Sequence, residues 1–379
     1  MRRLPADERP VFSGYRCLFS AIMSAAAMGC GSQDSGSTVG EDGVPRAFRK
    51  MPRAAVWIDS TTVDHAWMSR RVPSMAISTN GTLYYLRDDS TIAAFSSVTR
   101  AVHDRAIPQR RLGWSGRANR LAVFGDSLLG LLSTDGRELA VAELQSAQML
   151  WTATLPSPAF DLRLSAGGVH VASFASDSAR VYRIKARDVI DRIEARLPDS
   201  YRTQPTLRAV VPGFVFSADR NSGLWMFPGD GHLFLWFPSG TTSRTYIPPL
   251  RRLGTVAIDG NEQPIQADST LRSKISLPRY VSVLSDSIAI ALYRDSVTAT
   301  ARSPSVSYFV TLVNVKRSQV CADILLPHLS DRNAEFVLVR DTLYALATVI
   351  ASKPAQRLTR IRYHLRVPAC TWLGVQPGL

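Results

Sequence analysis

The 379-residue chain lacks the short motifs by which metal sites are usually recognised in a sequence. It contains no Cys-x-x-Cys, no His-x-His and no His-Glu-x-x-His, and its six histidines stand apart from one another. Each histidine is therefore interpreted as an ordinary strand residue rather than a ligand. We predict neither a metal site nor a cofactor. Because 45% of the residues are hydrophobic, the chain is long and apolar enough to bury a core.

The chain also lacks clustered positive charge, although its formal net charge is +14. Phosphate binding needs lysines and arginines gathered on one face. Here the basic residues are scattered, and only pairs such as Arg70 with Arg71 or Arg110 with Arg111 are adjacent. Scattered charge serves solubility and weak attraction to anionic surfaces. We therefore predict no nucleic-acid partner.

A single apolar run, residues 17–29, stands near the N-terminus and is too short to span a bilayer permanently. Four arginines precede it, as in a signal peptide. The run ends in Ala27-Met28-Gly29-Cys30, which resembles the lipobox of bacterial lipoproteins. That resemblance implies lipidation of Cys30 and a protein anchored to the cell envelope on its periplasmic or extracellular face.

The expected order is a signal peptide over residues 1–29, then the lipidated Cys30 and a flexible, Gly- and Ser-rich tether over residues 30–48. Two other interpretations stay open. The apolar run is also compatible with a buried helix followed by a loop, or with a secreted protein that is cleaved elsewhere.

After residue 50 the sequence has short alternating runs separated by Gly, Asp, Asn and Ser turns, without a long helical period. Residues 120–155 read as four strands joined by tight turns. One unit of this stretch, a turn residue and a small or hydroxyl residue before an apolar run, recurs roughly every 40 to 65 residues. The six copies begin at Gly81, Asp126, Gly167, Ser222, Asp286 and Asp341.

These repeats predict an all-β fold, a six-bladed β-propeller of four-stranded antiparallel blades within residues 49–379. Closing the ring buries blade faces that a lone sheet would leave exposed. A β-sandwich followed by a second β-domain is the alternative. The blades are expected near residues 73–110, 119–156, 159–198, 207–250, 278–327 and 333–373.

Segments such as Gly81-Thr82-Leu83-Tyr84-Tyr85 and Gly223-Leu224-Trp225-Met226 resemble repeats of exported bacterial six-bladed propellers, including NHL-type and sensor-associated propellers. The resemblance covers most of residues 70–373. Its motifs encode a turn and a strand rather than a site, so it implies a fold far more than a function. In that family propellers bind, scaffold, sense and in some cases catalyse in the central channel.

Two segments imitate functional motifs. Phe124-Gly125-Asp126-Ser127-Leu128 resembles the nucleophile block of GDSL esterases. We interpret it as a repeat turn, because the following residues continue as a strand and similar turns recur at Asp286 and Asp341. Asp219, Asn221 and Gly223 imitate the start of a calcium loop without its distal glutamate, and a hairpin turn is the better interpretation.

Three further groups are candidates. Cys321 and Cys370 are the cysteines of the folded part, and they form either a disulfide or two buried thiols. Trp225 and Trp236 are candidate ligand-facing aromatics, although alternating aromatics also pack blade against blade. His170, in a predicted second strand, could approach the channel.

The function expected from these observations is a binding or scaffold module, tethered to the membrane through its N-terminal lipid, for a protein or small-molecule ligand. The alternative is a propeller enzyme, such as a hydrolase, lactonase or lyase, with a site in the central channel. Such a site needs polar residues that converge from several blades.

Overall fold

The computed structural model describes residues 54–67, 72–88, 91–96, 107–108, 112–114, 116–175, 178–198, 214–218, 222–236, 242–253, 276–297, 305–330, 332–349 and 356–375. These residues belong to one compact unit, Pro52–Leu379. The predicted signal peptide, Cys30 and the tether lie outside the described residues. Among the residues described, no helix is both long and apolar enough to cross a membrane.

The described strands form six antiparallel sheets, which we number as blades in chain order. Blades 1 to 3 each follow one continuous stretch of chain. Blade 1 contains β2 (Met75–Ile77), β3 (Leu83–Asp88), β4 (Thr91–Phe95) and β5 (Ile107–Pro108). Blade 2 contains β6 (Ala118–Phe124), β7 (Leu128–Ser133), β8 (Glu138–Glu143) and β9 (Met149–Thr154). Blade 3 contains β10 (Ala159–Ser165), β11 (Gly168–Phe174), β12 (Ser178–Lys185) and β13 (Asp188–Arg196).

Blade 4 is also continuous, whereas blades 5 and 6 each gain a strand from a chain end. Blade 4 contains β14 (Val215–Ala218), β15 (Gly223–Met226), β16 (His232–Trp236) and β17 (Thr242–Tyr246). Blade 5 contains β18 (Leu277–Ser285), β19 (Ile288–Val297), β20 (Ser305–Asn314), β21 (Gln319–Leu325) and β25 (Trp372–Gly374). Blade 6 contains β22 (Arg332–Val339), β23 (Thr342–Val349), β24 (Gln356–Leu365) and β1 (Ala55–Trp67).

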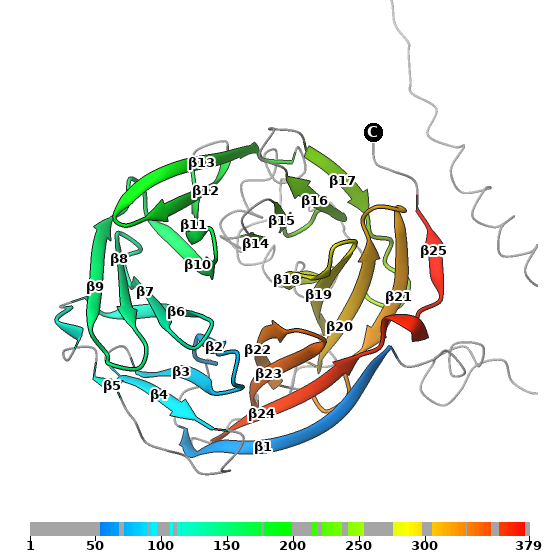
Figure 1. Ribbon diagram of the computed structural model, residues 1–379. Coiled ribbons are helices and arrows are strands. Elements are labelled where there is room, and N and C mark those ends of the chain that lie inside the picture. Colours follow the sequence, from blue (N-terminus) through cyan, green and yellow to red (C-terminus); the bar gives the residue numbers. More distant parts are fainter. Residues whose placement is uncertain are drawn as a thin grey trace, which may run out of the picture. The chain divides into compact units, whose positions relative to one another are not determined.

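The blades form a closed ring, as Figure 1 shows. The first strand of each blade contacts the first strand of the next, in the order β2, β6, β10, β14, β18 and β22, and β22 contacts β2 again. These first strands therefore line the inside of the ring. The prediction of an all-β, six-bladed propeller of four-stranded antiparallel blades is confirmed, and the sandwich alternative is excluded.

The repeated unit in the sequence marks the second strand of every blade. Its six copies lie at the start of β3, β7, β11, β15, β19 and β23. At Gly125 the turn has a φ of +61°, a backbone conformation that favours glycine. The apolar residues after each turn are buried on both sides of the strand, which explains why these strands read as nearly continuous apolar runs.

The core consists of apolar clusters between neighbouring blades rather than one central mass. Leu132 and Val141 of blade 2, for example, share a cluster with Leu162 and Val171 of blade 3. Burying both faces of each blade removes apolar surface from water at about 25 cal/mol per Å². Closure of the ring thus extends this burial to every interface between blades.

The last blade is completed by the first described strand of the chain. β1 lies antiparallel to β24, from the pair Ala55 with Leu365 to the pair Trp67 with Gln356. Figure 1 shows the two strands side by side, although they come from opposite ends of the sequence. The last blade expected from the sequence, near residues 333–373, did not include β1, because pairing between distant strands leaves no local pattern in the sequence.

The C-terminal segment leaves blade 6 and joins blade 5. After β24 a short 3₁₀ helix, η2 (Val367–Ala369), leads to β25, which pairs with β21. Cys321 and Cys370 form a disulfide in this region, with Cα atoms 5.5 Å apart. From the sequence a disulfide and two buried thiols were both open, since the outer strands of consecutive blades diverge. The path of the chain back to blade 5 brings the two cysteines together.

Candidate functional site

Five charged residues on the first strands form what we call the inner-strand cluster. They come from blades 2, 3, 5 and 6. Four of them lie at the third or fourth residue of their strand, toward one end of the ring, and Arg163 is the fifth residue of β10. Their side chains are partly exposed, between 17% and 42%. The members are Arg120, Asp161, Arg163, Arg279 and Glu335.

Arg163 extends across the inside of the ring. Its guanidinium carbon lies 5.7 Å from the ring centre of Phe216 in blade 4 and 5.7 Å from that of Tyr280 in blade 5. A residue of blade 3 can reach blade 5 only through the interior. The cation–π contacts with two rings hold the guanidinium in place.

Asp161 joins the two arginines of blades 2 and 3. Its Oδ2 lies 3.1 Å from Arg163 Nη2, and its Oδ1 lies 3.9 Å from Arg120 Nε. Oδ1 also accepts a hydrogen bond of 2.9 Å from the backbone N–H of Leu162. The carboxylate therefore has a fixed orientation.

The other two members form an ion pair between blades 5 and 6. Arg279 Nη2 lies 3.5 Å from Glu335 Oε1, and both side chains are about one-third exposed. Nearby, the hydroxyl of Tyr280 accepts a 2.9 Å hydrogen bond from Leu338 N–H. Exposed ion pairs contribute about 0–1 kcal/mol to stability, so this pair adds little to the packing of blade 5 against blade 6.

Three of the first strands are irregular at this end of the ring. The pairing register shifts between Ala118 and Arg120, between Ala159 and Asp161, and between Pro278 and Tyr280. Such β-bulges redirect side chains and are common beside functional sites. Each bulge lies directly at a member of the cluster.

The cluster carries three guanidinium groups against two carboxylates. Its net charge of +1 at neutral pH, inside a ring of low-dielectric walls, attracts small anions. Arginine presents five N–H donors in a planar fork that matches carboxylate and phosphate oxygens. The arrangement is thus suited to binding an anionic group.

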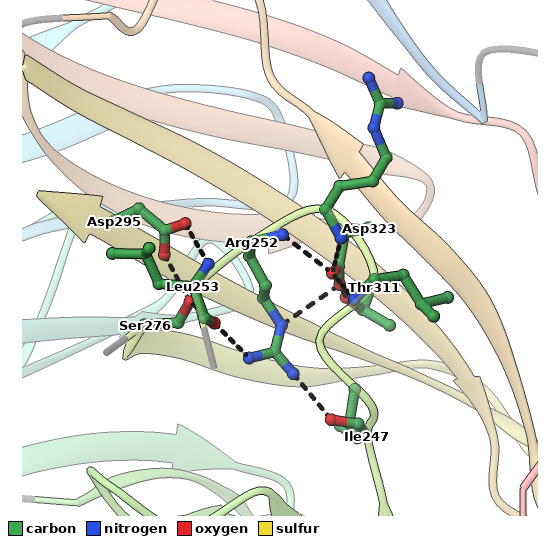
Figure 2. A network of polar contacts seen from close by, with 9 residues as sticks. Ile247, Arg252, Leu253, Ser276, Asp295, Thr311 and Asp323 are labelled. Atoms are coloured by element: carbon green, nitrogen blue, oxygen red, sulfur yellow. Dashed lines mark hydrogen bonds and ion pairs between the residues drawn. The ribbon is translucent and has the colours of Figure 1, made fainter. Parts of the chain in front are cut away.

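A second polar network is buried between blades 4 and 5 (Figure 2). Asp323 on β21 accepts hydrogen bonds from the backbone N–H groups of Leu250, Arg251 and Arg252. It also accepts a 2.6 Å hydrogen bond from Thr311 Oγ1, and it is 3.2 Å from Arg252 Nε. The side chains of Arg252 and Asp323 are at most 1% exposed, so this network fixes the chain between the two blades.

The guanidinium of Arg252 has partners on every side. It donates to the carbonyl oxygens of Ile247 and Leu253, and its carbon lies 3.8 Å from the ring centre of Tyr293. Burial raises the pKa of the Tyr293 hydroxyl. Among the described residues the Tyr293 hydroxyl has no hydrogen-bond partner. Because Arg252 and Asp323 are closed to solvent and hydrogen-bonded to the chain around them, their role is structural.

Asp295 closes the same network at the start of blade 5. Its Oδ2 accepts a 2.7 Å hydrogen bond from Leu253 N–H, and its Oδ1 is 2.5 Å from Ser276 Oγ. Ser276 Oγ also contacts the carbonyl oxygen of Leu253, but a hydroxyl has only one proton to donate. Burial raises the pKa of the Asp295 carboxyl, and its proton, when bound, supplies the missing donor.

The residues proposed from the sequence lie elsewhere. Trp225 is 2% exposed and packs with Phe214 and Phe227 between blades 3 and 4. With the partly buried Trp236 it lines a small apolar cavity of about 10 Å³, which is too small for a ligand. His170 is buried in β11.

Ser127 lies in the turn between β6 and β7, and a strand follows it. The neighbouring Asp126 Oδ1 accepts a 2.9 Å hydrogen bond from Asn80 N–H, which ties this turn to blade 1. Asp219 and Asn221 of the imitated calcium loop lie outside the described residues. Among the residues that the structure describes, no three His, Cys, Asp or Glu side chains gather as a metal site would require.

None of the five residues of the inner-strand cluster was among the candidates from the sequence. The available signal was a charged residue near the start of several first strands, directly before apolar residues. Arg120, Asp161 and Glu335 all follow this pattern. Scattered charges looked like surface charges because the ring that brings them together is not visible in any single repeat.

No protein-family model and no curated protein matches this chain. Solved structures of similar backbone include a predicted exported protein of Bacteroides fragilis, 12% identical with a TM-score of 0.49, over 82% of this chain and 94% of that one. The WD40 repeats of RRP9 are 14% identical with a TM-score of 0.48, over 83% and 99%. Hydrazine synthase of Kuenenia stuttgartiensis is 12% identical with a TM-score of 0.46, over 84% and 80%. The fold assignment here rests on strand pairing and blade contacts.

The raised pKa of Asp295 predicts a defined pH dependence of stability. The folded carboxyl binds its proton more tightly than the unfolded one, whose pKa is near 3.8. This contribution is full below that value and is lost as the pH rises through the folded pKa. Urea unfolding of wild type and Asp295→Asn from about pH 3 to pH 8 measures it. We expect wild type to lose stability relative to the variant as the pH rises, whereas parallel curves would contradict the assignment.

Proposed function

We propose that this protein is a binding module of the bacterial cell envelope, exported and tethered through a lipid on Cys30. Its ligand contacts the inner-strand cluster at one end of the ring. The observation that carries the binding role is that charged side chains on the first strands of four blades pair across the blades, with Arg163 reaching from blade 3 to Tyr280 of blade 5. This convergence is the feature that a channel-centred site requires.

The energetics of the cluster support a role in binding. Partly exposed ion pairs add little to stability, so folding alone does not require five charges on inner strands. The carboxylates of Asp161 and Glu335 pair with the arginines and so fix the positions of the guanidinium groups before a ligand binds. Such preorganisation lowers the entropic cost of binding.

The export part of the proposal is supported by the N-terminal sequence. The apolar run of residues 17–29, the preceding arginines and the small residue before Cys30 occur in the order that a lipoprotein signal requires. The disulfide between Cys321 and Cys370 is consistent with an oxidising compartment outside the cytoplasm.

The tether is tested by replacing the lipidated residue. The full-length gene is expressed in a bacterium with lipoprotein machinery, as wild type, as Cys30→Ala and as the matched control Cys17→Ala. We expect wild type and the control to sediment with membranes and to carry a diacylglycerol mass on Cys30, and the Cys30→Ala protein to lose both. A soluble, unmodified wild type would contradict the tether.

The binding role is tested by ligand retention. Purified wild type and an Arg163→Gln, Glu335→Gln double variant are incubated with a small-molecule extract of the cell envelope and dialysed, and the compounds released on denaturation are identified by mass spectrometry. We expect wild type to retain a compound in near-stoichiometric amount and the variant to retain about one-tenth or less. Equal retention of the compound by wild type and the double variant would show that the ligand does not bind at the cluster. Catalytic conversion of the compound would replace the binding role with an enzymatic one.

A further inference from the structure

We infer that Arg120 and Arg163, held by Asp161 between them, form a two-guanidinium fork that binds the carboxylate group of a small ligand. This inference rests on the binding function proposed above and names the ligand's chemical class. It assigns Arg120 and Arg163 as ligand contacts and Asp161 as a positioning residue.

The two guanidinium groups retain donors for a ligand. Arg120 Nη1 donates to the carbonyl oxygen of Asn119 at 3.2 Å, and Arg163 Nη1 donates to that of Leu162 at 3.3 Å. With the contacts to Asp161, these interactions use fewer than half of the ten N–H donors that two guanidinium groups carry. The side chains of Arg120 and Arg163 are 42% and 29% exposed, so a ligand can reach them.

The positions of these donors are set before binding. Arg163 is held from two sides by the rings of Phe216 and Tyr280, and from a third by Asp161. Asp161 is itself oriented by the N–H of Leu162. A planar arginine fork fixed in this way favours a planar, bidentate partner, and a carboxylate has that geometry.

The local charge favours a carboxylate over a phosphate dianion. Arg120, Arg163 and Asp161 sum to +1, which matches one carboxylate. A dianion would exceed this charge and would lie beside the Asp161 carboxylate, and like charges at such distances repel. The Arg279–Glu335 pair is neutral as a unit and does not change this balance.

The test uses propionate, which carries a single negative charge, and inorganic phosphate as probes on the purified full chain. Thermal unfolding midpoints are recorded against probe concentration at constant ionic strength, with chloride as the reference salt. Binding to the native state raises the midpoint in a saturable way, which gives an apparent Kd. We expect propionate to bind wild type more tightly than phosphate does. The apparent Kd for propionate should rise about tenfold or more in Arg163→Gln and in Arg120→Gln.

The matched control is Arg192→Gln on the outer strand β13 of blade 3, where the arginine is 57% exposed. Its apparent Kd should equal that of wild type. Arg163→Lys keeps the charge without the fork, so it should also weaken binding, and it provides a second measurement if Arg163→Gln fails to fold. An Asp161→Asn protein should bind phosphate better relative to propionate than wild type does, because the charge that repels a dianion is gone.

Three results would overturn the inference: no saturable response to propionate, the same response in both glutamine variants, or tighter binding of phosphate than of propionate. Failure here is distinct from failure of the binding role. Suppose that wild type retains a compound from the envelope extract that the double variant does not retain, and that this compound has no carboxylate. This result would support the proposed binding role and contradict only the assignment of a carboxylate ligand to Arg120 and Arg163.

Discussion

The pairing of β1 with β24 is the contact on which the ring depends. Without it, blade 6 would have three strands, and the backbone groups on the outer edge of β24 would lose their hydrogen-bond partners. Val63 of β1 also packs in the same apolar cluster as Leu83 of blade 1 and Leu358 of blade 6. One strand therefore completes the last blade and joins it to the first.

The other end of the described chain strengthens the neighbouring blade. β25 adds a fifth strand to blade 5, and the disulfide fixes the segment that leads to it. In the chain-entropy model, a cross-link that closes a loop of about 50 residues stabilises by about 4 kcal/mol. The two chain ends thus act on adjacent blades, where the ring closes.

The inner-strand cluster is a consequence of this closure. Arg163 reaches from blade 3 to blade 5, and Arg279 reaches from blade 5 to blade 6. The Arg279–Glu335 pair joins neighbouring blades, whereas the contact of Arg163 with Tyr280 skips blade 4 and therefore depends on the curvature of the ring. The buried network at Arg252 and Asp323 has a different task, because it fixes the path of the chain from blade 4 to blade 5.

Much of the fold could be predicted from the sequence because each blade repeats a local signal, a turn residue followed by an apolar second strand. The pairing of β1 with β24 could not, since its partners are separated by almost the whole domain. The cluster was missed for the same reason. Arg120 and Arg163 look like scattered surface charges until closure places their strands around one interior. Trp225 shows the converse, because its aromatic pattern suggested a ligand platform and the structure places it in the packing between blades 3 and 4.

A disulfide cross-link between β1 and β24 tests most directly whether β1 closes the ring. Thr62 on β1 and Thr359 on β24 are register partners. In a Thr62→Cys, Thr359→Cys protein, peptide mapping under non-reducing conditions should show a disulfide within one chain between these positions, formed without loss of native structure. The off-register pair Thr62→Cys, Ile361→Cys should form it poorly. Free thiols or cross-links between two chains in the first protein would show that β1 does not close the ring.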